Sequence, residues 1–338
     1  MSKVSICIPS HNHGAFIGKA IQSVLDQTFQ DFEIIVVDDC STDNSERVIK
    51  SFKDPRIKFF RNEKNLGMVP NTNKALRLAK SEFIGVLNSD DYYDPKMIET
   101  ALKAFDENPE IGFTYSSYVV VNENGEIITR VKSCASNKVF TSKEGFKKLA
   151  LGNVAPPSGV MVRKKCYEDV GPFDEEFPYC HDWNMWLRLS LKHDFACLSD
   201  YLLYYRMHRG NTSVALYNSF ETAVQEYGML KRLQGRVDPE LLPFVKEGAR
   251  RAAKRALVNS IGGLSRGGRG KAFEFFSKAL RLERGNLMWP LTPVCPFIIL
   301  SGWSGLRLSV SLYKKFLGVL KQSVPFHNPE AVFYRYGL

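Results

Sequence analysis

Three pairs of adjacent residues in this 338-residue chain carry carboxylates suited to a charged substrate: Asp38-Asp39, Asp90-Asp91 and His181-Asp182. Carboxylate oxygens are preferred ligands of Mg²⁺ and Mn²⁺. A carboxylate also accepts the proton that a hydroxyl group loses when it attacks an electrophilic carbon. A cavity lined by all three pairs would therefore bind a divalent cation together with a diphosphate, and it would keep one carboxylate as a general base.

Each pair adjoins an element that holds it in place. The first pair follows the β-branched run 32–37, and the second follows the apolar run 83–87. The third opens the segment 183–191, whose apolar spacing predicts an amphipathic helix. Because ligands of open α/β sheets bind at the carboxyl ends of the strands, we expect the first two pairs at that edge.

The N-terminal half of the chain alternates strand and helix patterns. Apolar runs at 4–9 and 32–37 are typical of strands buried on both faces of a parallel sheet, and helical spacing between them predicts a βαβ unit. The alternation continues with a strand at 57–60, a helix at 72–79, a strand at 83–87 and a helix that begins at Pro95. This order predicts a Rossmann-like α/β fold with a doubly wound mixed sheet.

The pattern changes near residue 216. Before it we expect a hairpin of strands at 111–121 and 126–131, a strand at 159–163 and a helix at 183–191. After it we expect only helices, at 220–233, 239–257 and 271–282, with a glycine-rich break at 262–270. The predicted domains are 1–215 and a C-terminal helical region, 216–338.

The composition is that of a soluble globular protein, with 44% hydrophobic and 24% charged residues. The seven cysteines are scattered and form no CxxC pair. This argues against a metal knuckle or a disulfide framework and favours a reducing cytoplasm. The N-terminus runs directly into the first strand, so we expect no signal peptide.

The net charge of +10 is concentrated late in the chain, in Lys246, Arg250, Arg251, Lys254, Arg255, Arg266, Arg269 and Lys271. No basic motif interleaved with aromatic residues supports nucleic-acid binding. An anionic membrane surface is the favoured partner, because each basic residue near it contributes about 1 kcal/mol. A solvated helix face without a partner remains the alternative.

Residues 285–306 carry no charge and include Trp289 and Trp303. Their length approaches that of a membrane span, but Pro290, Pro293 and Pro296 would break a helix in lipid. We favour an interfacial element that docks on a membrane. A plain packed domain and a true span remain open.

Five motifs in order resemble glycosyltransferase family 2, the inverting enzymes of the GT-A fold: V-S-I-C-I-P-S-H-N, I-I-V-V-D-D-C-S-T-D, N-L-G, L-N-S-D-D and H-D-W-N-M-W-L-R-L. The resemblance covers about residues 3 to 215. It implies a metal-dependent inverting glycosyltransferase that uses a nucleotide-sugar, with a UDP-sugar favoured. The implied cofactor is Mn²⁺ or Mg²⁺.

The matching positions imply a nucleotide pocket. Asp39 resembles the carboxylate that contacts the nucleoside, and the N-x-G loop of Asn65 and Gly67 would pass close to the nucleotide. The full set of residues expected to bind the nucleotide-sugar is Pro9, His11, Asn12, Asp39, Asn65, Gly67, Asn88, Ser89, Asp90 and Arg206.

The acidic turn 87–91 resembles the metal-binding D-x-D segment of the family, with Asn88 in place of its first acidic residue. The resemblance implies Asp90 as the first cation ligand, Asp91 and His208 as further ligands, and Asp182 as the general base. Structural roles remain open for the same residue types, since aspartates at strand and helix ends also form Asx-turns and caps.

The acceptor implied by these features is a saccharide or a lipid-linked saccharide in surface polysaccharide synthesis, reached from the cytoplasm or from the inner face of the membrane. Two alternatives remain: a sugar nucleotidyltransferase, and a non-catalytic binding or scaffold protein. The sequence does not select the donor sugar or the linkage.

Overall fold

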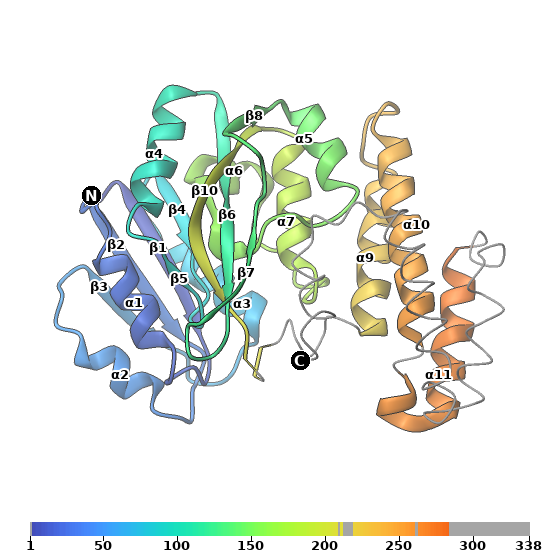
Figure 1. Ribbon diagram of the computed structural model, residues 1–338, viewed down its shortest axis with the longest axis horizontal. Coiled ribbons are helices and arrows are strands. Elements are labelled where there is room, and N and C mark those ends of the chain that lie inside the picture. Colours follow the sequence, from blue (N-terminus) through green and yellow to red (C-terminus); the bar gives the residue numbers. More distant parts are fainter. Residues whose placement is uncertain (1, 209, 212–218, 261–262, 284–338) are drawn as a thin grey trace. The chain divides into compact units, whose positions relative to one another are not determined.

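The computed structural model describes residues 2–208, 210–211, 219–260 and 263–283 (Figure 1). The chain divides into two compact units, and the main division falls after His208. The first unit holds residues 2–149 and 153–208, and the second takes in 150–152 and the helices that follow. The domain limits 1–215 and 216–338 stay a prediction, and the segment 285–306 lies outside the described residues.

The first unit begins with the predicted parallel sheet. Strands β1 (Val4–Ser10), β2 (Phe32–Asp38), β3 (Ile57–Arg61) and β4 (Phe83–Val86) pair in the order β3-β2-β1-β4. Helices α1 (Ile17–Leu25), α2 (Ser45–Ser51) and α3 (Met68–Leu78) connect them. β2 is buried along its whole length, as the continuous apolar run predicted.

Antiparallel strands extend this sheet beyond β4. β9 (Val160–Arg163) pairs antiparallel with β4 and with β6 (Ile111–Val121), and β10 (Asp194–Arg206) runs parallel to β6. β5 (Tyr92–Tyr93) pairs antiparallel with the end of β10. The α/β prediction with a mixed sheet is therefore confirmed, although the thirteen-residue strand β10 was not predicted.

The remaining elements of this unit are α4 (Met97–Glu107), β7 (Ile127–Val131), β8 (Lys138–Phe140), α5 (Ser142–Leu149), the 3-10 turn η1 (Pro157–Gly159), α6 (Lys164–Val170) and α7 (His181–Ser190). The predicted hairpin is present as β6 and β7. The helix expected at 183–191 is α7, and it begins two residues earlier, at His181.

Pairing brings four strand ends to one edge of the sheet. Ser10 of β1 lies opposite Asp38 of β2, and the Leu87 amide donates to the Cys7 carbonyl. Tyr204 of β10 pairs with Tyr92 of β5, and the two rings stack with centroids 4.6 Å apart. The residues after β1, β2, β4 and β10 therefore share the carboxyl edge of the parallel strands.

The second unit is helical, with α9 (Phe220–Leu233), α10 (Leu242–Asn259) and α11 (Gly263–Leu282). The predicted glycine-rich break at 262–270 was wrong in extent, because α11 already begins at Gly263. Gly268 has φ 71°, so the backbone turns within the helix. Further along α11, Phe275 packs on Phe220 of α9, with ring centroids 4.4 Å apart.

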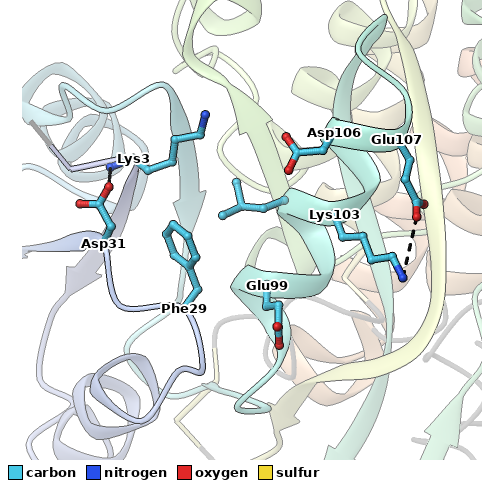
Figure 2. A pocket seen from close by; sticks show the side chains of 8 residues that line it. Lys3, Phe29, Asp31, Glu99, Lys103, Asp106 and Glu107 are labelled. Carbon is cyan, nitrogen blue, oxygen red and sulfur yellow. Dashed lines mark hydrogen bonds and ion pairs between the residues drawn. The ribbon is translucent and has the colours of Figure 1, made fainter.

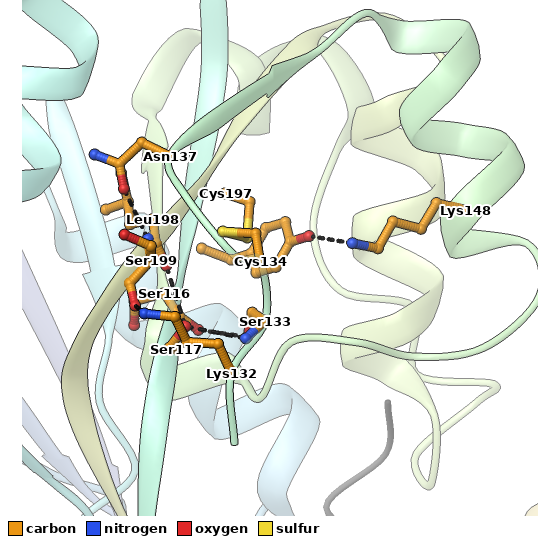
Figure 3. Close-up of a disulfide and its surroundings, with 11 residues drawn as sticks. Ser116, Ser117, Lys132, Ser133, Cys134, Asn137, Lys148, Cys197, Leu198 and Ser199 are labelled. Carbon is orange, nitrogen blue, oxygen red and sulfur yellow. Dashed lines mark hydrogen bonds between the residues drawn. A yellow bond between two sulfur atoms is a disulfide. The ribbon is translucent and has the colours of Figure 1, made fainter. Parts of the chain in front are cut away.

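The sequence argued against a disulfide framework, and the described residues contain one disulfide that it did not predict. Cys134 and Cys197 form it, although 63 residues separate them (Figure 3). β8 pairs with β10 and aligns Lys138 with Cys197, so the segment between β7 and β8 lies against the strand. Non-local pairing of this kind leaves no spacing signal in the sequence.

Part of the basic charge is neutralised within the second unit. Arg251 pairs with Glu247 at 3.1 Å, and Arg255 pairs with Glu226 at 2.5 Å. Of the helices in the described ranges, none combines the length and apolarity that crossing a bilayer requires. Membrane docking therefore stays a proposal, and the ion pairs fit the alternative of a solvated helix face.

Glu33 anchors the opposite, amino edge of the sheet and is only 6% exposed. Burial alone raises the pKa of its carboxyl group, but hydrogen bonds from Lys58 Nζ, Ser5 Oγ and the Lys80 amide outweigh this effect and lower the pKa. A carboxylate with a lowered pKa stabilises the fold above its unfolded pKa, and this contribution is lost as the pH falls through the folded pKa.

We therefore expect Glu33→Gln to lower the free energy of unfolding at pH 7 by about 1.5–3 kcal/mol, the usual worth of hydrogen bonds to a charged group. The difference from the wild type should shrink as the pH falls below about 4.3, where the unfolded carboxyl group also becomes protonated. Urea unfolding at pH 7 and at a pH below about 4.3 measures the difference. Glu107→Gln, at an exposed residue, is the control, and it should change the free energy of unfolding little at either pH. An equal difference at both pH values would contradict the assignment.

Candidate active site

The carboxyl edge of the parallel strands gathers most of the predicted site residues. Pro9 lies near the end of β1, Asp39 follows β2, and the acidic turn Asn88–Asp91 follows β4. Arg206 ends β10 on the same edge, where its backbone amide reaches Asp91. Segments that are far apart in sequence therefore meet here because of the sheet topology.

Asp38 has a structural role at this edge. Its side chain is fully buried and accepts hydrogen bonds from the amide and the hydroxyl of Ser41, three residues on, so it closes the turn that follows β2. Arg61 Nε lies 3.4 Å from the same carboxylate. Asp38 therefore makes the kind of structural contacts that the sequence left open for aspartates at strand ends.

Asp39 holds the N-x-G loop. Its Oδ1 accepts from Asn62 Nδ2 at 2.7 Å and from the Leu66 amide at 2.8 Å, and its Oδ2 accepts from the Gly67 amide at 2.9 Å. Gly67 has φ 91°, a conformation that favours glycine, and it precedes the first turn of α3. Asp39 is itself only 2% exposed, so it shapes the loop that would face a nucleotide.

His11, Asn12 and Asn65 form a polar surface beside this loop. The carbonyl oxygen of Asp39 lies 2.8 Å from His11 Nδ1, so that nitrogen must donate. His11 Nε2 then accepts from the side-chain amides of Asn12 and Asn65, each at 3.1 Å. Asn12 and Asn65 are exposed and His11 is half-buried, which leaves polar groups open to a ligand.

The acidic turn after β4 is fixed by its neighbours. Asp91 accepts from Ser158 Oγ at 2.6 Å and from the Arg206 amide at 2.9 Å, and it is 1% exposed. Burial and then the adjacent Asp90 raise the pKa of Asp91 well above its ordinary value. This favours the neutral form and makes Asp91 the poorer cation ligand of the two.

Arg206 holds this turn through its side chain. Its Nε donates to the carbonyl oxygen of Asp90 at 2.9 Å, and one terminal nitrogen donates to the carbonyl oxygen of Glu123 at 2.7 Å. The guanidinium group also lies over the rings of Phe16 and Tyr92, about 5 Å from each centroid. These contacts make Arg206 a support for the turn in this conformation.

A second cluster contains two histidines. The ligand atoms of His13, Asp90 and His208 all lie within 4.8 Å of one another. His208 Nε2 is 3.2 Å from Asp90 Oδ2, and the His208 ring packs on Phe16 with centroids 4.4 Å apart. Asp91 does not belong to this cluster. His13 was missed in the sequence, where the signal was a second histidine two residues after His11 at a strand end.

Asp182 lies in the first turn of α7 and is partly exposed. Its Oδ2 accepts from Asn153 Nδ2 at 2.8 Å, and its Oδ1 accepts from the Trp183 amide at 2.7 Å. The adjacent His181 has a structural contact, since its Nδ1 lies 2.9 Å from the Pro178 carbonyl oxygen. Asp182 therefore lies at the positive end of the α7 dipole.

A short segment links Asp182 to the acidic turn. At one end of the segment, the Asn153 side-chain amide donates to Asp182. At the other end, the Ser158 hydroxyl donates to Asp91 and accepts from the Asn88 backbone amide at 3.1 Å. Five residue steps span at most about 18 Å when fully extended. This length limits how far the general-base candidate can lie from the turn that holds the cation-ligand candidate.

The cavity in Figure 2 is a different feature. It has a volume of about 610 Å³ and lies at the amino edge of the sheet, lined by Lys3, Phe29 and Asp31 together with residues of α4. None of the predicted site residues lines it, and it belongs to the edge opposite to Asp39 and Asp90.

Comparison with known sequences identifies the family. The model of Glycosyl transferase family 2 matches residues 5–171. An uncharacterized glycosyltransferase of Methanocaldococcus jannaschii is 30% identical over 209 residues, which cover 60% of this chain and 70% of the relative. The Escherichia coli enzyme UDP-Glc:alpha-D-GlcNAc-diphosphoundecaprenol beta-1,3-glucosyltransferase WfaP is 30% identical over 236 residues, 69% of this chain and 87% of the relative.

Solved structures share the fold. S. aureus TarS, residues 1–349 in complex with UDP-GlcNAc, aligns with a TM-score of 0.59 at 18% identity, over 83% of this chain and 91% of that one. Mannosyltransferase PcManGT from Pyrobaculum calidifontis, in complex with GDP-Man and Mn²⁺, aligns with a TM-score of 0.56 at 14% identity, over 99% and 88%. The chain is therefore an enzyme of glycosyltransferase family 2 with the GT-A fold.

Proposed function

We propose that this enzyme is a metal-dependent inverting glycosyltransferase that moves a sugar from a UDP-sugar to a hydroxyl group of a lipid-linked saccharide. The observation that carries the proposal is the segment 153–158, which hydrogen-bonds both Asp182 and the turn that contains Asp90. A base and a diphosphate site must lie on opposite sides of one anomeric carbon in a direct displacement, and this segment joins two groups of those kinds.

On the donor side, the loop held by Asp39 would form one wall of the nucleotide site. Pro9, His11, Asn12, Asn65 and Gly67 contribute to it through the polar surface and the amides described above. A uridine nucleotide is favoured because TarS is solved with UDP-GlcNAc and with UDP, and WfaP is named for UDP-Glc.

Asp90 and His208 would hold a divalent cation, Mn²⁺ or Mg²⁺. One carboxylate and one imidazole within 3.2 Å of each other are a suitable donor pair for such an ion. When bound, the cation neutralises the charge that develops on the departing diphosphate. Asn88 and Ser89 would contact the nucleotide-sugar from the same turn, and Arg206 would keep that turn in place.

Asp182 would act as the general base. It lies at a helix N-terminus and is oriented by Asn153, so one carboxylate oxygen would take the proton from the acceptor hydroxyl group as the hydroxyl oxygen attacks. The sugar then inverts at its anomeric carbon, and the diphosphate leaves on the opposite side. Neither a nucleotidyltransferase nor a non-catalytic binder is favoured by this arrangement and family.

The lipid-linked acceptor is proposed from the relatives. WfaP and a second E. coli enzyme, WfgD, which is 28% identical over 227 residues, are both named for alpha-D-GlcNAc-diphosphoundecaprenol. An acceptor of this kind lies in a membrane, which fits a peripheral location at its inner face. The basic residues of the C-terminal helices would then favour an anionic surface.

We expect Asp182→Asn to reduce the transfer rate at least about 100-fold, since general-base catalysis contributes roughly 10²–10⁴. Asparagine keeps the size of the side chain and an oxygen for Asn153, so binding of the nucleotide-sugar should be unchanged. Transfer from UDP-glucose and UDP-GlcNAc to GlcNAc-diphosphoundecaprenol measures the rate, and calorimetry measures binding. The exposed Asp200→Asn is the matched control. Wild-type transfer by Asp182→Asn would refute the role of Asp182.

We expect Asp39→Ala to weaken UDP binding about tenfold or more. The change removes three hydrogen bonds to the loop, and hydrogen bonds to a charged group are each worth about 1.5–3 kcal/mol. Titration calorimetry with UDP and Mn²⁺ measures the affinity, and Asp31→Ala at the opposite edge serves as the control. Unchanged affinity in a folded Asp39→Ala protein would show that the loop does not form the nucleotide site.

A further inference from the structure

We infer that His13 is a third protein ligand of the cation, and that the resulting set of two imidazoles and one carboxylate selects a divalent transition metal over Mg²⁺ and binds it without nucleotide. The inference rests on the metal site of the proposed function and extends it to a residue outside the D-x-D-like segment. It concerns the ligands of the protein and the ion that they prefer.

The three donor groups already lie close together. The ligand atoms of His13, Asp90 and His208 lie within 4.8 Å of one another. Ligands about 2.1 Å from one ion are separated by roughly 3–4 Å, so small rotations of the side chains bring them into coordination. The His13 and His208 rings meet edge to face, with centroids 5.6 Å apart.

The orientation of His13 is set by its surroundings. Its Nδ1 lies 2.7 Å from the hydroxyl of Ser89, the residue before Asp90. A metal-binding histidine typically engages its other ring nitrogen in a hydrogen bond of this kind, which fixes the tautomer and the ring plane. Ser89 therefore ties His13 to the acidic turn and directs Nε2 to the ligand role.

The backbone of His13 is also fixed. Its amide donates to Ser45 Oγ at 3.1 Å, and the next amide, of Gly14, donates to Asp43 Oδ2 at 2.8 Å. A Cβ atom at Gly14 would come within 2.9 Å of the Ser45 backbone nitrogen, so glycine permits this close approach. The turn 43–45 thus fixes the backbone that carries His13.

The chemistry of the donors determines the metal. Mg²⁺ prefers oxygen ligands. Imidazole binds Co²⁺ and Zn²⁺ best, Mn²⁺ less well and Mg²⁺ least well. Asn88 brings an amide where the family motif has a carboxylate, and both oxygens of Asp91 accept bonds from Ser158 and Arg206. The site therefore offers a single charged oxygen donor and two nitrogens, and Mn²⁺ or Co²⁺ should displace Mg²⁺.

The test measures cation binding by the full-length, EDTA-treated enzyme without nucleotide. Free Mn²⁺ is followed by electron paramagnetic resonance, competition with Mg²⁺ gives the selectivity, and pulsed resonance detects nitrogen bound to Mn²⁺. We expect Mn²⁺ to bind at least tenfold more tightly than Mg²⁺. His13→Gln should weaken Mn²⁺ binding about 10–100-fold, as loss of metal-site interactions typically does, and reduce the nitrogen signal. His11→Gln, in the same loop, should leave both unchanged.

The outcomes separate the two proposals. Wild-type Mn²⁺ affinity and nitrogen signal in a folded His13→Gln protein would overturn the role of His13 while leaving Asp90 and His208 as ligands. Equal affinities of the wild type for Mn²⁺ and Mg²⁺ would overturn the selectivity. Absence of Mn²⁺ binding until UDP is added would overturn binding without nucleotide. Asp90→Asn tests the metal site itself, because unchanged Mn²⁺ binding there would refute the proposed function. Circular dichroism of each variant confirms its fold.

Discussion

The acidic turn after β4 depends on keeping two adjacent carboxylates in a buried position. Burial, and then repulsion by the adjacent Asp90, raises the pKa of Asp91. The turn persists because donors converge on it: Ser158 and the Arg206 amide bond Asp91, while Arg206 Nε bonds the Asp90 carbonyl oxygen. Arg206 reaches the turn because β10 pairs on one side with β6, where Arg206 lies opposite Val121, and on the other with β5, where Tyr204 lies opposite Tyr92.

In two of the three pairs first noted in the sequence, one member is held by hydrogen bonds within the fold and its neighbour is the proposed site residue. Both oxygens of Asp91 accept hydrogen bonds, whereas Asp90 lies beside His13 and His208. His181 bonds the Pro178 carbonyl oxygen, whereas Asp182 is partly exposed. The first pair differs, because Asp38 and Asp39 both serve structure. Asp39 acts on the site indirectly, through the backbone of the N-x-G loop. Adjacent residues in a turn point in different directions, which makes such a division of roles the expected outcome.

Local patterns predicted the strands β1 to β4, α1 and α9 well, because continuous apolar runs and helical spacing are local signals. They did not predict β10, whose burial follows no regular period, nor the Cys134–Cys197 bond beside its pairing with β8. Arg206 was predicted to bind the nucleotide-sugar, and its packing on Phe16 and Tyr92 could not be predicted, because those residues lie more than about a hundred positions away in the sequence. Such contacts are properties of the sheet topology and leave no periodic trace.

His13 and His208 show what this topology achieves. One follows the first strand of the unit and the other follows the last, yet both meet Asp90, which follows a strand in the middle. A cation held by all three would join the ends of β1, β4 and β10 at one point. Its binding free energy would then favour the conformation in which β10 is docked on the sheet, because a ligand that binds only the assembled site stabilises it. The same set of contacts would thus shape the diphosphate site and secure the strand that supports the turn.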